Sequence, residues 1–154
     1  MRTINEIIIH CSATKEGQDY TVKQIEGWHR ARGFNGIGYH FVIYRDGTIH
    51  RGRTLLQVGA HCLNHNAYSI GICYIGGLNA EGKPKDTRTD AQREALRTLV
   101  LMLKEIYPEA KVLGHRDTSP DKNHNGIVEP SEWLKARPCF DVKEWYNEIK
   151  TITK

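Results

Sequence analysis

The fold is decided by a stretch that opens with Gly114-His115-Arg116-Asp117 and closes with Lys135-Ala136-Arg137-Pro138-Cys139-Phe140-Asp141. A short apolar run before it predicts a strand that delivers His115 to its end. The connection between the two motifs is rich in side-chain oxygens, and Asp141 predicts the capped start of a last helix. An ordinary connection does not need so many groups that bind metal ions. The stretch therefore predicts a functional site.

Outward from this stretch, apolar runs alternate with helices whose starts carry capping residues. An Asp-Gly turn between two of the runs predicts a β-hairpin. Strands alternating with capped helices predict an α/β fold, with a mixed central β-sheet flanked by about three α-helices in a single domain. The expected strands are residues 4–11, 39–44, 49–51, 69–75 and 111–114, and the expected helices are residues 21–33, 89–107 and 141–149.

Composition narrows the class of partner. The net charge is +4, but the basic residues are spread along the chain, so we expect no nucleic-acid partner. No apolar run approaches the ~18 residues that a membrane helix needs, so we expect no membrane partner either. The four cysteines show no CxxC spacing, which favours reduced thiols. A monomer is the default expectation.

His10 and His115 each lie near the end of a predicted strand. If these strands are parallel neighbours, the two imidazoles emerge at the same edge of the sheet. Two histidines with a third protein ligand and an open position form the layout of a catalytic zinc site. A lone histidine at a strand end is also common as a structural core residue, and spacing alone does not decide between the two.

Several motifs occur together in the order found in one known family. The chain resembles the zinc-dependent N-acetylmuramoyl-L-alanine amidases of type 2, which include amidase-type phage lysozymes and peptidoglycan recognition proteins. The resemblance covers nearly the whole chain and implies their fold. It is carried by Ile8-Ile9-His10-Cys11-Ser12-Ala13-Thr14, Gly38-Tyr39-His40-Phe41, Arg45-Asp46-Gly47-Thr48, Val58-Gly59-Ala60-His61, Asn64-His65-Asn66, Ser69-Ile70-Gly71-Ile72 and Gly114-His115-Arg116-Asp117.

The resemblance implies hydrolysis of the amide between N-acetylmuramic acid and the L-alanine of the peptidoglycan stem peptide. It implies that His10 and His115 are zinc ligands and that Tyr39 and Lys135 are catalytic. A zinc ion supplies an activated water at neutral pH and polarises the scissile carbonyl. Tyr39 and Lys135 are then expected to donate hydrogen bonds to the developing oxyanion.

Three further residues are expected to bind the substrate, a peptidoglycan strand or muropeptide. They are His61, Asn66 and Arg116. The chain shows no signal-peptide core after Met1, so we expect it to be cytoplasmic as synthesised and released to the cell wall through a phage holin or a secretion system.

One departure from the family concerns the third zinc ligand. In the phage members this ligand is a cysteine in the pattern lysine, any residue, cysteine, proline, and that register places Arg137 here. A guanidinium has no acceptor and cannot bind zinc. Cys139, two residues later, is the predicted replacement because a thiolate is a good zinc ligand. The alternative is a peptidoglycan-binding module with weak or lost catalysis.

Residues 121–132 resemble a calcium-binding EF-hand loop inserted into the amidase domain. The loop pattern has oxygen ligands at positions one, three, five, seven and twelve and glycine at position six. An Asn/Gly-rich insertion that merely turns is the alternative. The expected calcium ligands are Asp121, Asn123, Asn125, Ile127 and Glu132.

Overall fold

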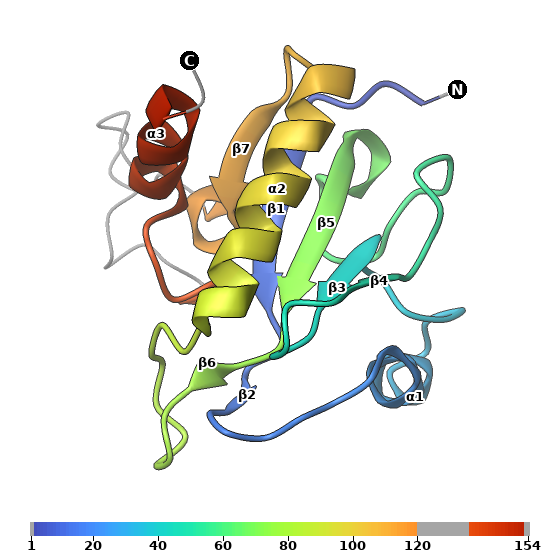
Figure 1. The fold of residues 1–154 in the computed structure, drawn as a ribbon. Helices are drawn as coiled ribbons and strands as arrows, with labels where there is room; N and C mark the ends of the chain where they lie inside the picture. The colour runs from blue at the N-terminus through green and yellow to red at the C-terminus, as the bar shows by residue number, and fades with distance from the viewer. Residues whose placement is uncertain (1, 120–135, 153–154) are drawn as a thin grey trace.

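A computed structural model of the chain describes residues 2–119 and 136–152. Its centre is a five-stranded sheet with the strand order β4-β3-β5-β1-β7 (Figure 1). β1 pairs in parallel with β5 and β7, and β3 pairs in parallel with β5, whereas β4 pairs antiparallel with β3. The predicted mixed sheet is therefore confirmed. The strands are β1 (Glu6–Cys11), β3 (Phe41–Ile43), β4 (Ile49–Arg51), β5 (Ser69–Tyr74) and β7 (Lys111–Gly114).

The three predicted helices are present. Thr21 and Thr89 each accept a hydrogen bond from the backbone N–H three residues later, at Gln24 and Gln92, and complete the expected capping boxes. A two-stranded sheet and two 3-10 turns were not predicted. The helices are α1 (Val22–Ala31), α2 (Asp90–Ile106) and α3 (Val142–Ile152), the small sheet is β2 (Thr14–Lys15) with β6 (Gly77–Leu78), and the turns are η1 (Asn66–Tyr68) and η2 (His115–Thr118).

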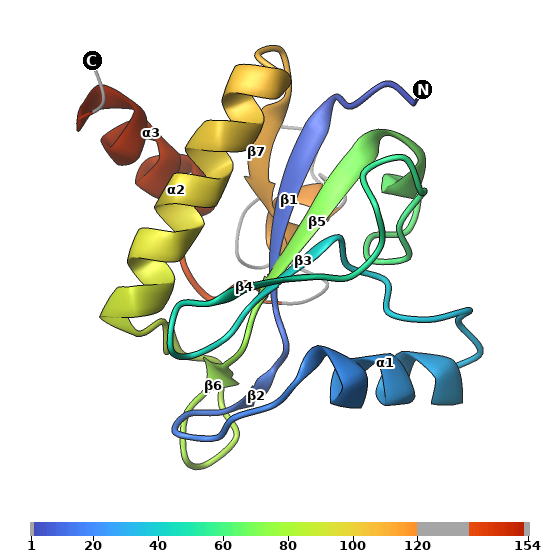
Figure 2. The same cartoon turned by 45° about the vertical axis from the view of Figure 1, so that its right-hand side comes forward.

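Each face of the sheet has its own helices. Side chains alternate between the faces of a strand, so Ile7 and Ile9 of β1 pack in the main core with α2 and α3. A second, smaller core joins Ile25 of α1 to Val42 and Cys73 on the opposite face. Figure 2 shows α1 on the side of the sheet away from α2 and α3. This burial of apolar surface is the main force that fixes the helices on the sheet.

The alternation places His10 on the α1 face, because its neighbours Ile9 and Cys11 lie in the core beneath α2. Ile9 pairs with Gly114 across the parallel ladder, so the residue after each of them leaves at the same end of the sheet. Those residues are His10 and His115.

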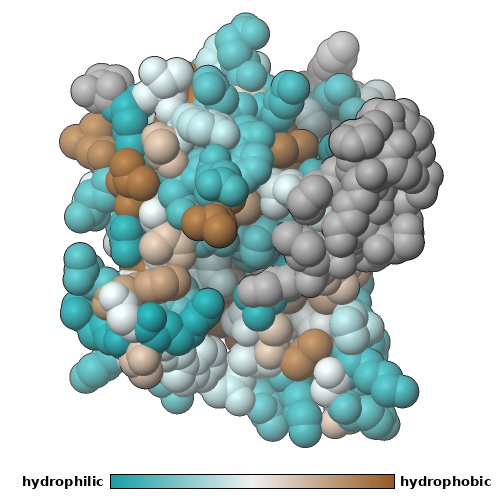
Figure 3. Space-filling view, turned by 180° about the vertical axis from the view of Figure 1, so that it is seen from behind, coloured by the Kyte–Doolittle hydropathy of each residue, from teal (hydrophilic) through white to brown (hydrophobic). Residues whose placement is uncertain are grey.

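The face opposite α2 is mainly hydrophilic, with apolar side chains in separate groups (Figure 3). Among the described residues, no helix is long and apolar enough to cross a membrane.

Candidate active site

His10 and His115 lie side by side, as their positions in the sequence predict. Their ring centroids are 4.6 Å apart, and the rings are tilted by 55°. His10 is fully buried, whereas His115 at the start of η2 is half-buried. The parallel pairing of β1 with β7 is the physical cause of this meeting.

Tyr39 lies on the other side of His10, in the segment that enters β3. Its ring centroid is 5.2 Å from that of His10, and the residue is only 5% exposed. Burial raises the pKa of the Tyr39 hydroxyl well above its ordinary value, although the positive charge of Arg137 opposes the shift. The hydroxyl is therefore a neutral hydrogen-bond donor at physiological pH.

His61 contacts His10 directly. The His61 Nδ1 lies 2.8 Å from the His10 Nε2, and the His61 Nε2 lies 3.1 Å from the Ser69 Oγ. Burial lowers the pKa of His61 well below its ordinary value, and the neighbouring His40 and His115 lower it further. A neutral imidazole is therefore expected at position 61.

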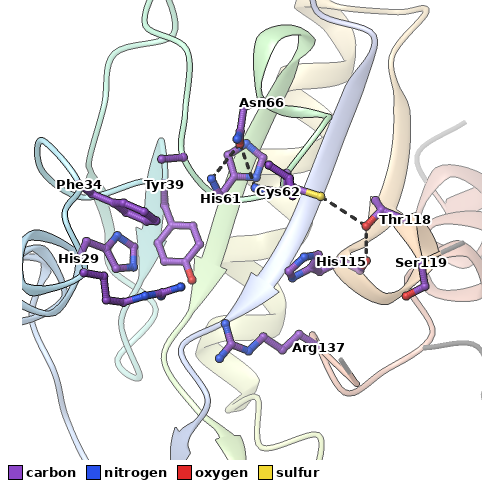
Figure 4. A pocket seen from close by; sticks show the side chains of 13 residues that line it. His29, Phe34, Tyr39, His61, Cys62, Asn66, His115, Thr118, Ser119 and Arg137 are labelled. Atoms are coloured by element: carbon purple, nitrogen blue, oxygen red, sulfur yellow. Dashed lines mark hydrogen bonds between the residues drawn. The ribbon is translucent and has the colours of Figure 1, made fainter. Parts of the chain in front are cut away.

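Tyr39, His61 and His115 line a cavity of about 400 Å³ between α1 and η2, whereas His10 is not among its lining residues (Figure 4). His29 contributes from α1, and its Nδ1 accepts a hydrogen bond of 2.8 Å from the backbone N–H of Gly38. Burial, with the nearby Arg32, lowers the pKa of His29 to about 4, so this imidazole is also neutral. The residues that line the cavity are His29, Arg32, Phe34, Tyr39, Ala60, His61, Cys62, Leu63, Asn66, His115, Thr118, Ser119 and Arg137.

Arg137, which stands in the expected third-ligand register, is one of the residues that line the cavity. Figure 4 shows its side chain reaching from the loop before α3 toward the side of Tyr39. Hydrogen bonds hold this loop in place: the backbone N–H of Arg116 donates to the Arg137 carbonyl at 2.8 Å, and the Tyr74 hydroxyl donates to the Pro138 carbonyl at 2.6 Å. The loop therefore presents a guanidinium to the cavity.

Cys139, the predicted replacement ligand, is not among the residues that line the cavity. Its Sγ lies 3.3 Å from the Gly77 carbonyl oxygen, and its backbone has a positive φ of 72°. A hydrogen bond from the Cys11 thiol lowers the pKa of Cys139 to about 7, and Arg116 and Arg137 also favour its thiolate. The thiol therefore faces the small sheet.

The expected substrate-binding residues have different surroundings. His61 and Asn66 line the cavity, but the Asn66 Oδ1 accepts hydrogen bonds of 2.8 and 2.9 Å from the backbone N–H groups of His61 and Cys62. Arg116 does not line the cavity. The proposed catalytic Lys135 and the proposed calcium loop at 121–132 lie outside the described residues.

Sequence reasoning missed the residues that support His61. A Cβ on Gly71 would lie 2.5 Å from the His61 Cγ, and a Cβ on Gly59 would lie 2.6 Å from its Cδ2. Only glycine leaves room for the ring at these two places. The available signal was Gly71 itself, because a glycine inside an apolar strand often marks a close approach of another group.

The donor set fits a zinc site in part. His10 and His115 are two adjacent imidazoles, the first buried and the second half-buried, which suits two nitrogen ligands. Within residues 2–119 and 136–152, however, no group of three or more His, Cys, Asp or Glu side chains is arranged to hold a metal ion. The described residues therefore place two candidate nitrogen ligands together and show no third candidate beside them.

Comparisons with known proteins agree on one class. Residues 1–126 match the family model described as N-acetylmuramoyl-L-alanine amidase. The endolysin of Klebsiella phage KP32 is 39% identical over 149 residues, which cover 97% of this chain and 89% of that protein. The solved amidase LysC from Clostridium intestinale is 29% identical with a TM-score of 0.73, covering 99% of this chain and 86% of the other. Bumblebee PGRP-SA, at 22% identity, shares the fold with a TM-score of 0.72 over 96% of this chain and 82% of its own.

Proposed function

The chain belongs to the N-acetylmuramoyl-L-alanine amidase family and hydrolyses peptidoglycan, and we propose that the reaction takes place in the cavity between Tyr39 and His115. The bond that is cut joins N-acetylmuramic acid to the L-alanine of the stem peptide. One observation carries the assignment of the site: His10, His115 and Tyr39, which lie far apart in the sequence, meet at one end of the sheet.

Zinc is the proposed cofactor, with His10 and His115 as two of its ligands. The pair of adjacent imidazoles supports this assignment. When bound, zinc supplies an activated water and polarises the scissile carbonyl. Cys139 is the third ligand that the sequence predicts, but its contact with the Gly77 carbonyl gives that prediction no support, so we propose no third ligand among the described residues.

The chain's own side chains are proposed to bind and orient the amide. The protonated Tyr39 hydroxyl is a suitable donor to the oxygen of the scissile carbonyl, and burial makes such a hydrogen bond stronger than it would be in water. The Arg137 guanidinium is a second donor that faces the same cavity. Lys135 keeps its proposed role as a further donor, although it lies outside the described residues.

A second candidate function is binding of peptidoglycan with weak catalysis. Arg137 is the observation that favours it, because a guanidinium stands where the phage relatives are expected to have a ligand. Zinc content separates the two candidates, since a weak catalyst of this kind would bind zinc poorly.

The site of action and the calcium loop are also proposals. Similarity to a phage endolysin supports a lysin that is made in the cytoplasm and released to the cell wall. Calcium bound at 121–132 would order the segment before Arg137.

The test is digestion of purified peptidoglycan with the zinc-loaded protein. Amidase cleavage is expected to release stem peptides that carry a new α-amino group on L-alanine, which mass spectrometry of the soluble products identifies. Products that are cut within the glycan or within the peptide, with intact muramoyl-alanine bonds, would contradict the proposed function.

A further inference from the structure

His61 is buried at the back of the cavity, and its surroundings hold it in one orientation. Its ring lies against Gly71 of β5, where any added Cβ would lie 2.5 Å from the His61 Cγ. Its backbone N–H donates to the Asn66 Oδ1 at 2.8 Å, which fixes the loop that carries it. Residue 61 is 9% exposed, so little of the ring is available to a substrate.

Both ring nitrogens of His61 have a partner. The Nδ1 lies 2.8 Å from the His10 Nε2, and the Nε2 lies 3.1 Å from the Ser69 Oγ. The two imidazole planes are nearly perpendicular, at 88°, so that the edge of one ring meets the other. The three side chains form a row that starts on β5 and ends at His10 (His61 is labelled in Figure 4).

This row determines which ring nitrogen of His10 can bind a metal ion. The contact with His61 occupies the His10 Nε2, so a metal ion bound by His10 would be bound through Nδ1. A neutral imidazole has a lone pair on Nδ1 only when its proton is on Nε2. His10 can therefore act as a ligand through Nδ1 only if its Nε2–H donates to the His61 Nδ1.

We infer that His61 is a positioning residue for His10: its Nδ1 accepts the His10 Nε2–H, and its own Nε2–H donates to the Ser69 Oγ. This arrangement fixes the tautomer and the ring orientation of His10. It also replaces the expected role of His61 as a substrate contact. Outer partners of this kind orient the histidine ligands of metal sites and raise their basicity. The assignment of the proton to the His10 Nε2 rests on the proposed function, because it follows from metal binding through Nδ1; NMR tests it directly.

The position of the proton can be measured by NMR on protein labelled with ¹⁵N-histidine. In both zinc-free and zinc-loaded protein, we expect scalar coupling across the hydrogen bond between the two nitrogens, with the proton covalently bonded to the His10 Nε2. A proton bonded to the His61 Nδ1, or no coupling between these nitrogens, would overturn the inference.

Two nearly isosteric substitutions test the consequence for the metal. His61→Asn can keep an acceptor oxygen near the position of Nδ1, whereas His61→Leu has the same branching without an acceptor. We expect His61→Leu to lower zinc affinity about 10- to 100-fold, measured by competition with a chelator, and His61→Asn to retain most of it. Equal affinities of the two variants would contradict the inference.

His10→Ala separates this inference from the proposed function. If His10→Ala binds zinc as well as the unmodified protein does, the assignment of His10 as a ligand fails. The NMR measurement then still decides whether His61 accepts the proton of His10. A thermal unfolding midpoint for each variant shows whether the fold is retained.

Discussion

On one side of the cavity, His10 lies on strand β1 and His61 packs against strand β5, and the two side chains contact each other. On the other side, His115 lies on the 3-10 turn η2 and Arg137 lies on the loop before α3. We call these the strand side and the loop side. The strand side carries the His61 imidazole, whose pKa burial lowers, and beside it the Tyr39 hydroxyl, whose pKa burial raises, whereas the loop side adds a guanidinium. The residues proposed for zinc binding and oxyanion stabilisation thus include His10 on the strand side, whereas Arg137 on the loop side departs from the pattern of the phage members.

The largest expected effect tests the strand side. His10→Ala removes one proposed zinc ligand, so we expect zinc content and the rate of peptidoglycan hydrolysis to fall by more than ~100-fold. That is the largest loss expected when a residue that only hydrogen-bonds to a metal ligand is replaced. Elemental analysis and dye release from labelled peptidoglycan measure the two quantities. Arg137→Ala is the matched change on the loop side, and we expect its zinc content to be no lower than that of the unmodified protein. A larger loss in Arg137→Ala than in His10→Ala would reverse the comparison.

Tyr39→Phe removes a hydroxyl from the strand side and leaves the ring in place. If Tyr39 donates to the developing oxyanion, kcat should fall about 10²- to 10³-fold with little change in zinc content. The raised pKa of Tyr39 also predicts that the hydroxyl stays protonated above pH 10, so its ionisation should not appear in the pH profile of the reaction below that value. An unchanged kcat in Tyr39→Phe would remove Tyr39 from the catalytic residues.

Arg137→Cys tests whether the loop side alone limits the metal site. Because the loop presents residue 137 to the cavity, a thiol there would provide a third ligand beside two imidazoles. We expect zinc affinity to rise at least about tenfold, equivalent to ~1.4 kcal/mol. Cobalt-loaded Arg137→Cys should also show the thiolate charge-transfer absorption that a cysteine ligand produces.

Cys139→Ser is the control for Arg137→Cys. The Cys139 Sγ contacts the Gly77 carbonyl. We therefore expect Cys139→Ser, made in the otherwise unmodified protein, to have the same zinc affinity and the same cobalt spectrum as that protein. Loss of a thiolate band in Cys139→Ser would instead establish Cys139 as the ligand, as the sequence predicted.

The same contrast explains how far the sequence could predict the site. His10 and His115 were predictable because two apolar runs deliver them to adjacent strand ends, and the parallel register of β1 and β7 follows from the fold. The direction in which a side chain points from the loop was not predictable. It depends on long-range hydrogen bonds, such as the one from the Tyr74 hydroxyl to the Pro138 carbonyl, which no local pattern encodes. For the support of His61 by Gly71, the sequence offered only the glycine within an apolar strand; it did not show that the group packed there is the His61 ring of a distant loop.

Stability at acid pH tests the buried histidines around the strand side. Burial lowers the pKa of His29 and of His40 to about 4, against an ordinary value of 6.5. The unfolded chain therefore binds more protons than the folded chain between these values, and stability should be fully present above pH ~6.5 and fall as the pH drops toward 4. Urea unfolding midpoints across that range measure the loss. His29→Gln should make the loss shallower, and an unchanged slope would show that His29 does not take up a proton on unfolding.

The smallest expected effect lies at the far end of the row that supports His10. Ser69→Ala removes the partner of the His61 Nε2 but leaves the contact between His61 and His10 and the packing of His61 on Gly71. A neutral hydrogen bond contributes about 0.5–1.5 kcal/mol, so zinc affinity should fall by roughly two- to tenfold at most, and by less than in His61→Leu. A loss as large as that of His61→Leu would mean that Ser69, and not the strand packing, holds the ring in place. The rigidity of the strand side would then depend on one hydroxyl, and its contrast with the loop side would be much weaker.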